Sequence, residues 1–351
     1  SRYEEIKCNK RDKSPGACNK CPKIATCHLD KYFYYATQAN EEYKNDLVDF
    51  REGINMTTSE VKELAEILKP LLDQGQSLYQ IKSSHKEIKQ CIKTLYSYIE
   101  MGVFKQYGID NFSLKEQVNR KQFKNKYKKR KESTNYENHK YNDYIKFKED
   151  NLEIPTTEMD TVLNSQSGPY IQTFYFEGSG IMIGFIHKEK TSESMAKTLD
   201  ALEKKLGHDL YRELFTLILT DRGVEFEKVN LFEFNQETGE FRTNIFYCDA
   251  YQSSQKPHVE NTHNYIRDII PNEIDMSDIT QEDLNLMFSH INSTPRKSLK
   301  GKTPYEVFRF MMGTSDNPNR GKEILNLFNI TEIKRDEVTL KPYLLKHNKK
   351  K

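Results

Sequence analysis

The sequence lacks any apolar run near the roughly 18 to 20 residues that a membrane helix needs. It also begins without the apolar segment of a secretory signal. Hydrophobic residues make up 36% of the 351 positions and charged residues 30%, so part of the chain must lie outside any large core. These shortages argue against a membrane-embedded or exported protein. We expect a soluble cytoplasmic protein of two or three domains, with no membrane partner.

Cysteine and net charge are also scarce. Six cysteines in a chain of this length do not make a disulfide framework. The net charge of +2 says nothing about partners, but the charge is unevenly distributed. Residues 120–131 hold eight Lys or Arg in twelve positions, which indicates a local basic segment rather than a basic protein.

Four of the cysteines lie near the N-terminus in loop-like sequence. Their spacing is Cys8-x9-Cys18-x2-Cys21-x5-Cys27, which includes a C-x2-C pair. Four thiolates suit a tetrahedral structural Zn²⁺ site, in which His28 could replace Cys27; four reduced thiols are the alternative. The following residues, 29–47, are expected to form a helix.

Three helices are predicted between residues 57 and 101. The first covers 57–72, Ser77 starts the second, and the third runs from Glu87 to Met101 with Cys91 in its core. Two short helices and a tight turn before a third helix resemble a helix-turn-helix that binds double-stranded DNA. A small bundle with a solvated face is the alternative. The outward face of the third helix carries side chains suited to phosphates and base edges: Lys89, Gln90, Lys93, Thr94 and Ser97.

Residues 107–150 show little periodicity and are expected to form a linker or arm. Phe123 and Tyr127 interleave with the basic residues there, as in an arm that follows a phosphate backbone. A plain solvated segment is the alternative. The cations expected to contact DNA are Arg120, Lys121, Lys124, Lys128, Lys129 and Arg130.

From residue 154 the pattern changes to strands and amphipathic helices. Strands are predicted over 157–163, 170–178, 180–188, 214–220 and 241–250, and helices over 192–206, 256–270 and 281–291. This order matches an α/β RNase H-like core, a mixed sheet flanked by helices.

Three acidic residues stand out within that pattern. Asp160 is a lone acid in mid-strand, Asp221 ends an apolar strand, and Glu260 opens a helix. An RNase H-like fold brings such positions to one point, where three carboxylates can hold two Mg²⁺ ions, or Mn²⁺, for attack on a phosphodiester. Asn261, Asn264 and Arg267 lie near the face of Glu260 and suit contact with a scissile phosphate. The competitors for the third position are Asp249, Glu225 and Glu227.

These motifs together make residues 154–309 resemble the catalytic domain of DDE transposases of the IS-thirty insertion-sequence family. Arg222, Val259 and Pro257-His258 depart from the residues usual in that family. The matching residues are Asp160-Thr161-Val162, Thr220-Asp221-x-Gly223-x-Glu225-Phe226, Tyr251-x-Ser253-Ser254-x-Lys256, Glu260-Asn261, Asn264, Arg267, Asn292-x-x-Pro295-Arg296-Lys297 and Thr303-Pro304-x-Glu306-Val307-Phe308.

The resemblance implies a bacterial, nucleoid-associated enzyme that binds the terminal inverted repeats of an element. It would cleave and join DNA with two magnesium ions, through a circular intermediate. Asp160, Asp221 and Glu260 would be the catalytic metal ligands, and Lys256 a further DNA contact. Synapsis of two element ends would require a homodimer or larger assembly on end and target DNA.

The expected organisation has five parts. They are a cysteine-rich zinc segment with a helix (1–45), a helix-turn-helix domain (46–106), a basic arm (107–153), the catalytic domain (154–309) and a C-terminal tail (310–351). A domesticated, non-catalytic DNA-binding relative and an RNase H-like nuclease are the alternative functions.

Overall fold

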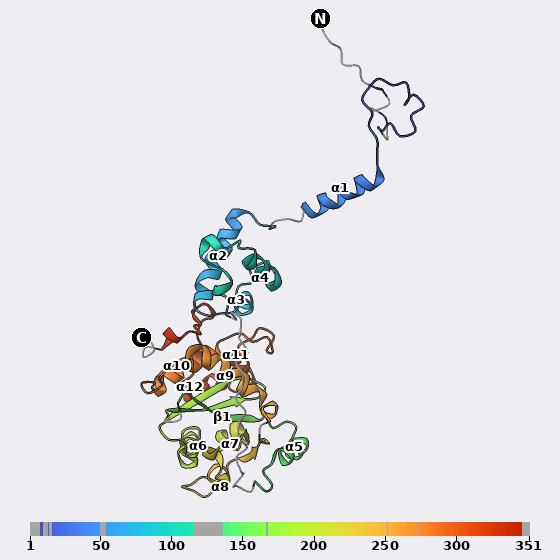
Figure 1. Ribbon diagram of the computed structural model, residues 1–351. Helices are drawn as coiled ribbons and strands as arrows, with labels where there is room; N and C mark the ends of the chain where they lie inside the picture. The colour runs from blue at the N-terminus through green and yellow to red at the C-terminus, as the bar shows by residue number, and fades with distance from the viewer. Residues whose placement is uncertain are drawn as a thin grey trace. The chain divides into compact units, whose positions relative to one another are not determined.

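The computed structural model describes residues 8–9, 13, 16–49, 54–115, 136–165, 168–250, 252–272 and 274–345. The chain forms two compact units, Ser1–Thr57 and Thr58–Lys351 (Figure 1). The basic segment 120–131, with all six of its predicted DNA contacts, lies outside the described residues. None of the helices in the described part of the chain combines the length and apolar character that membrane crossing requires.

The first unit contains a cysteine loop and one helix, α1 (Ala36–Asp49). The prediction that this helix starts at residue 29 is wrong. Residues 29–35 are not helical, because the backbone there hydrogen-bonds to the loop instead. The Cys18 N–H donates to the Tyr32 carbonyl (2.5 Å), and the Tyr34 N–H donates to Asn19 Oδ1 (2.6 Å).

The second unit begins with α2 (Thr58–Asp73), α3 (Leu78–Ser84) and α4 (Ile92–Glu100). The first two agree with the prediction, and Ser77 caps α3 in a capping box with Gln80. The third helix starts five residues later than predicted, because the Cys91 thiol is exposed and caps the helix by accepting from the Thr94 N–H (3.4 Å). The predicted core position of Cys91 is therefore wrong.

A five-stranded mixed sheet forms the centre of this unit, in the order β3-β2-β1-β4-β5. The strands are β1 (Thr157–Leu163), β2 (Tyr170–Phe176), β3 (Met182–His187), β4 (Leu217–Thr220) and β5 (Asn244–Tyr247). β1 pairs antiparallel with β2 and parallel with β4, which pairs parallel with β5. The sheet fits the predicted RNase H-like core.

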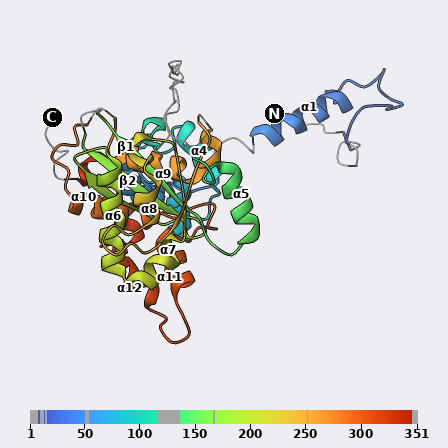
Figure 2. The same ribbon diagram turned by 90° about the horizontal axis from the view of Figure 1, so that it is seen from below.

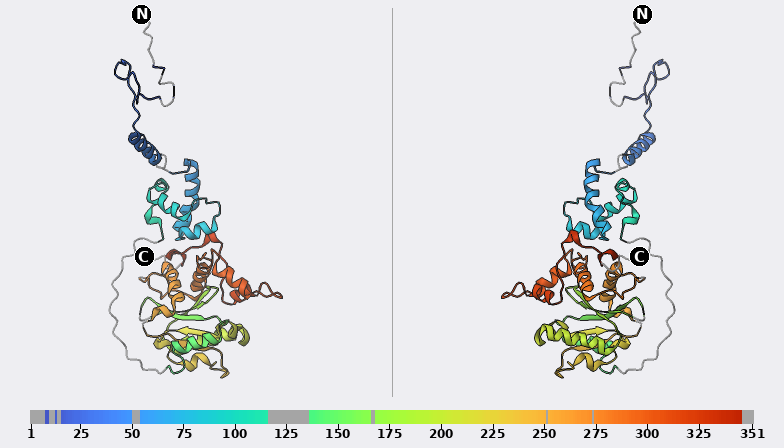
Figure 3. Two further views of the ribbon diagram at one scale, coloured as in Figure 1. Left: turned by 90° about the vertical axis from the view of Figure 1, so that its right-hand side faces the viewer. Right: turned by 90° about the vertical axis from the view of Figure 1, so that its left-hand side faces the viewer.

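Helices cover both faces of the sheet (Figures 2 and 3). α6 (Ser192–Leu206), α7 (His208–Phe215) and α8 (Val229–Glu233) lie on one face, and α9 (Pro257–Ile269) and α10 (Gln281–Asn292) lie on the other. α7 includes the first two residues of the predicted strand 214–220, because Leu214 and Phe215 are buried on that helix. Short 3-10 turns connect the elements: Lys105–Tyr107, Asn111–Ser113, Val224–Phe226, Ser253–Gln255, Arg335–Glu337 and Pro342–Leu344.

The end of the predicted arm is a helix, α5 (Tyr141–Asp150). Its aromatic side chains pack on Phe246 of β5, with Tyr144 and Phe147 ring centroids 6.0 and 5.6 Å away. Apolar burial against the sheet therefore orders sequence that looks featureless by periodicity.

The described part of the predicted C-terminal tail, residues 310–345, packs into the second unit. It contains the end of α11 (Pro304–Met312) and α12 (Arg320–Leu327), followed by a segment, residues 328–345, with buried Val338 and Leu340. Gln76 Nε2 donates to the carbonyls of Arg335 and Val338, both at 2.9 Å. The segment is thereby joined to the loop between α2 and α3.

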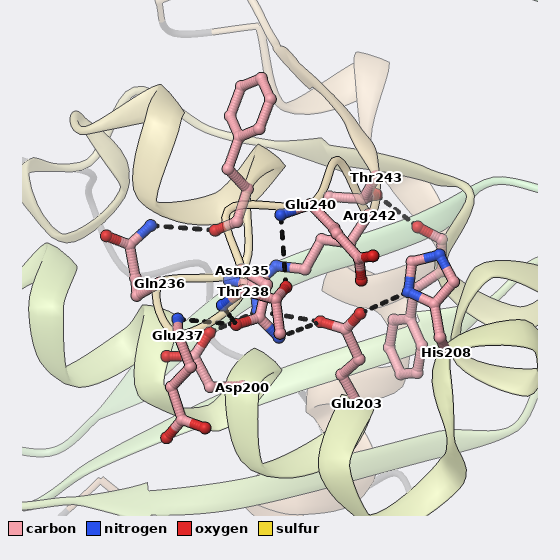
Figure 4. Close-up of polar contacts among 12 residues, drawn as sticks. Asp200, Glu203, His208, Asn235, Gln236, Glu237, Thr238, Glu240, Arg242 and Thr243 are labelled. Atoms are coloured by element: carbon pink, nitrogen blue, oxygen red, sulfur yellow. Dashed lines mark hydrogen bonds and ion pairs between the residues drawn. The ribbon is translucent and has the colours of Figure 1, made fainter.

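A buried guanidinium organises the sheet edge at β5 (Figure 4). Arg242 is fully buried; it donates to the Phe232 and Leu231 carbonyls and pairs with Asp200 at 2.5 Å. Glu203 joins this network and accepts from His208 at 2.7 Å. Because every charge in the network has a partner, its role is structural.

Candidate catalytic carboxylates and the α9 groove

The strand register sets Asp160 and Asp221 side by side. In the parallel ladder, Thr157 is opposite Ile218 and Glu158 is opposite Leu219. Continuing that register by two residues brings Asp160 opposite Asp221, on strands about 4.8 Å apart. Both side chains point to the same face as α9, because side chains alternate along each strand. Two of the three predicted carboxylates are therefore neighbours.

The pKa of Asp221 shows the effect of that proximity. Crowding by protein atoms raises the pKa of this carboxyl, and the negative charge of Asp160 raises it further, against the opposing effect of Lys256. Its side chain still reaches solvent. The pair thus concentrates negative charge between the middle of β1 and the carboxyl end of β4.

Lys256 supplies a counter-charge to this pair. Its Nζ lies 3.2 Å from Asp160 Oδ2 and also donates to the Met159 carbonyl, and its side chain is only 5% exposed. Burial acts to lower the pKa of Lys256, but Asp160 and Asp221 outweigh it and the pKa is raised. The residue predicted to contact DNA is, in this structure, an internal partner of the carboxylates.

α9 lies along β1 through a row of polar contacts. The Val259 N–H donates to Glu158 Oε2 (2.7 Å), and His263 Nε2 bonds Thr173 Oγ1 (3.0 Å) while its Nδ1 lies 4.0 Å from Asp160. Burial lowers the pKa of His263 to about 4, so the ring is neutral at pH 7. Further along the helix, Arg267 donates to the Leu163 carbonyl (3.0 Å).

Glu260 lies on the flank of α9 that makes these contacts. Residues 256, 260, 263 and 267 are three or four positions apart, so their side chains share one side of the helix. We call Lys256, Glu260, His263 and Arg267 the carboxylate flank. Glu260 is exposed, and among the described residues no three His, Cys, Asp or Glu side chains are arranged to hold a metal ion. The structure therefore brings Asp160 and Asp221 together and leaves Glu260 on the adjoining helix.

Two of the three competing acids have cationic partners. Asp249 Oδ1 accepts from Arg222 at 3.0 Å, and buried Glu225 pairs with Lys190 at 2.9 Å. Glu225 is close enough to raise the pKa of Asp221. Glu227 follows Glu225 at the end of a 3-10 turn.

The other side of α9 faces a groove of about 730 Å³. We call His258, Asn261, Tyr265 and Asp268 the groove flank. The predicted DNA contacts Asn261, Asn264 and Arg267 line the groove, although Arg267 also ties α9 to Asn164 and β1. The opposite walls come from α3, β2 and residues 296–298.

The predicted DNA contacts of the third helix are only partly on a helix. Lys93, Thr94 and Ser97 belong to α4, whereas Lys89 and Gln90 precede it because the helix starts at Ile92. Lys93 and Ser97 are exposed.

The four N-terminal cysteines Cys8, Cys18, Cys21 and Cys27 line one small cavity. All four are free thiols, and the Tyr32 N–H donates to Cys18 Sγ (3.3 Å). They share the cavity but are not arranged as a metal-binding group within the described part of the chain.

Two charged residues were not assigned to this site from the sequence. Glu158 is buried beside Asp160 on the same strand face, and burial raises its pKa. Arg296 lines the groove with its guanidinium carbon 3.9 Å from the Tyr265 ring centroid. Period-two alternation in β1 could have revealed Glu158, and the Pro295-Arg296-Lys297 motif contained Arg296.

No family model matches the chain. It is 33% identical over 104 residues to "Transposase InsI for insertion sequence element IS30A" of Escherichia coli (strain K12), covering 30% of this chain and 26% of that protein. It is 30% identical over 99 residues to "Transposase for insertion sequence element IS4351" of Bacteroides fragilis, covering 28% of each. "Putative integrase ORF3" of Spiroplasma virus SpV1-R8A2 B is 26% identical over 221 residues, covering 62% of this chain and 63% of that protein.

Among solved structures, the HTLV-2 integrase catalytic core domain in complex with magnesium matches with a TM-score of 0.30 and 16% identity. The match covers 44% of this chain and 93% of that one. The matched part of this chain spans only about a quarter of the IS30A transposase. Over its matched stretches, the chain is similar to transposases of IS30 and other insertion sequences, which confirms the resemblance that its motifs predicted.

Proposed function

We propose that this chain is a DNA transposase that cleaves and joins phosphodiester bonds at the ends of an insertion sequence. The observation that carries the proposal is the proximity of Asp160, within β1, and Asp221, just after the neighbouring parallel strand β4, where the charge of Asp160 raises the pKa of Asp221. α9 supports it by placing Glu260 on the flank that contacts Asp160. The similarity to insertion-sequence transposases agrees with this chemistry.

The residues fit a pair of divalent cations such as Mg²⁺ or Mn²⁺. Carboxylate oxygens are the ligands that such ions prefer. Asp160 and Asp221 bring two negative charges together, and from α9 the cation that acts on Asp221 is Lys256, at the start of the helix. When bound, two such ions would activate a water or 3′-hydroxyl nucleophile and stabilise the leaving oxygen. Glu260 would complete the ligand set by turning inward from α9.

The chain's own residues have separate tasks in this proposal. The Thr161 N–H donates to Asp160 Oδ1 (2.8 Å) and fixes the orientation of that carboxylate. Lys256 limits the repulsion between the two acids, and its ion pair with Asp160 would break when the metal ions bind. Neutral His263 holds Thr173, so it orients α9 without adding charge.

DNA binding in this proposal is shared among several parts. α3 and α4 would act as a helix-turn-helix on the terminal inverted repeats, and the basic segment 120–131 would follow the phosphate backbone. Joining two ends through a circular intermediate would require a dimer or larger assembly near the bacterial nucleoid. We also propose that Cys8, Cys18, Cys21 and Cys27 close on a structural Zn²⁺; a purified chain without bound zinc would contradict this.

The decisive experiment is strand transfer by the Asp221→Ala variant on DNA that carries the inverted repeats of its element. We expect joining to fall by more than about 100-fold, because the variant loses a metal ligand. End binding should be nearly unchanged, because the variant keeps every DNA contact. Asp249→Ala, which removes an exposed acid at the next strand end, is the matched control. Equal loss of end binding by Asp221→Ala would show that the residue is structural and would remove the basis of the proposal.

A further inference from the structure

The groove beside α9 contains more positive charge than its acids can neutralise. Its walls contribute four cations, Lys115, Arg267, Arg296 and Lys297, and one carboxylate, Asp268. Lys115 pairs with that carboxylate at 2.7 Å. Arg267 donates to Asn164 and to the Leu163 carbonyl at the end of β1. Two of the cations are therefore already engaged inside the protein.

Arg296 is different, because no carboxylate pairs with it in the described part of the chain. Its Nη2 donates to the Ile291 carbonyl at 3.3 Å, and its Nε is buried with no hydrogen-bond partner among the described residues. Burial lowers the pKa of the guanidinium, although Tyr265 and Tyr175 counter this. A partly buried guanidinium with an unused donor is costly unless an anion binds to it.

The aromatic side chains around Arg296 hold the guanidinium plane in place. Arg296 lies over the Tyr265 ring at 3.9 Å, and Lys115 approaches the same ring at 4.5 Å. Beside them, the His258 and Tyr175 rings stack with centroids 5.5 Å apart and planes 7° from parallel. A planar cation fixed on a ring, next to a flat aromatic pair, suits a phosphate with an adjoining base.

The groove also lies next to the candidate carboxylates. Tyr175, which lines the groove, is opposite Glu158 in the β1–β2 ladder, and Glu158 is two residues before Asp160 on β1. Asn261, which also lines the groove, follows Glu260 on α9. Ser77 and Gln80 from the start of α3 form part of the opposite wall. A strand lying in the groove would therefore contact both α3 and α9.

We infer that Arg296 binds a backbone phosphate of a DNA strand that lies in this groove next to the candidate carboxylates, with Lys297 beside it and Tyr265 beneath it. The inference rests on the proposed function and adds one specific binding residue to it. Phosphate suits the site because Arg presents paired N–H donors in a fork that matches its oxygens.

The test measures affinity for a short DNA duplex of arbitrary sequence over a series of KCl concentrations, with metal chelated so that no cleavage occurs. For Arg296→Gln in the full chain we expect binding roughly ten- to a hundredfold weaker, and a salt slope smaller by about one. Arg296→Lys should recover only part of the affinity, because Lys keeps the charge but loses the fork. Thermal unfolding of each variant checks that it is folded.

Arg309→Gln is the matched control, because Arg309 also lies over a tyrosine ring, Tyr305 at 6.0 Å, but has a carboxylate partner, Glu332 at 3.4 Å. It should bind DNA like the wild type. If Arg296→Gln is folded and keeps wild-type affinity and salt slope, the inference is wrong while the transposase proposal stands. If the wild type itself fails to bind this duplex, the inference is overturned, and strand transfer by Asp221→Ala on the inverted repeats decides the transposase proposal separately.

Discussion

The two flanks of α9 present opposite electrostatic situations. The carboxylate flank faces two acids, Asp160 and Asp221, and its Lys256 and His263 lie next to Asp160. The groove flank faces a groove whose walls hold four cations and one acid, and its Tyr265 lies beneath one of these cations, Arg296. One helix therefore separates a place suited to metal cations from a place suited to phosphates. The comparison teaches that residues adjacent in sequence, such as Glu260 and Asn261, should differ in the step that they affect.

The largest expected effect would come from Glu260→Gln. We expect joining to fall by more than about 100-fold with DNA affinity unchanged, because the amide keeps the shape but loses the charge that a divalent cation needs. Asn261→Ala, one position along on the groove flank, is the matched variant and should weaken affinity a fewfold instead. Measuring both joining and affinity for each variant separates the flanks; the same phenotype from both would erase the distinction.

A second test removes the cation of the carboxylate flank. Lys256→Met should lower the free energy of unfolding by about 3 to 5 kcal/mol without divalent metal, because Asp160 and Asp221 are left facing each other. Added Mg²⁺ should restore stability to this variant more than to the wild type, as urea titrations would show. Lys297→Met on the exposed groove wall is the control, with an expected change of about 0.5 kcal/mol or less. Equal responses to Mg²⁺ would mean that Lys256 and the ion do not share these acids.

The smallest expected effect concerns His187, which lies on neither flank of α9 and contributes to the pH dependence of the free energy of unfolding. Burial lowers the pKa of His187 from 6.5 to about 4, and its nitrogens bond Ser194 and Gln172. Because the unfolded chain takes up this proton first, the contribution of His187 to stability should be complete above pH 6.5 and fall by roughly 3 kcal/mol as the pH drops towards 4. Burial also lowers the pKa values of His263 and His290 to about 4, so His187→Gln should make this part of the curve less steep in denaturant titrations without removing it. An unchanged curve would assign the acid sensitivity to other groups.

Much of the fold could be predicted from the sequence because its pattern is local. The three strands β1 to β3, α6, α9 and α10 follow hydrophobic periodicity and turn residues, and all appear close to their predicted limits. α4 could not be placed as well. Ile88 continues the apolar spacing of Ile92 and Leu95 and is buried, but it lies in the turn before the helix. The helix begins at Ile92 because the Cys91 thiol caps it.

The proximity of Asp160 and Asp221 was predictable, but the surroundings of the pair were not. The mid-strand position of Asp160 and the strand-end position of Asp221 indicated a convergent pair, and the register brings them together. The pairing of Lys256 with Asp160 could not be predicted from the sequence, because it depends on the position of α9 along β1. Arg296 likewise becomes distinctive only when the structure reveals that no carboxylate lies opposite it.

The bonds from Gln76 to Arg335 and Val338 have a consequence for biosynthesis. They join residues up to 262 positions apart, so α3 cannot be seated on the rest of its unit until nearly the whole intervening chain has left the ribosome. While translation continues, the loop between α2 and α3, whose Gln74 and Gln76 later bond Leu340 and Val338, stays open to chaperones and to other nascent chains.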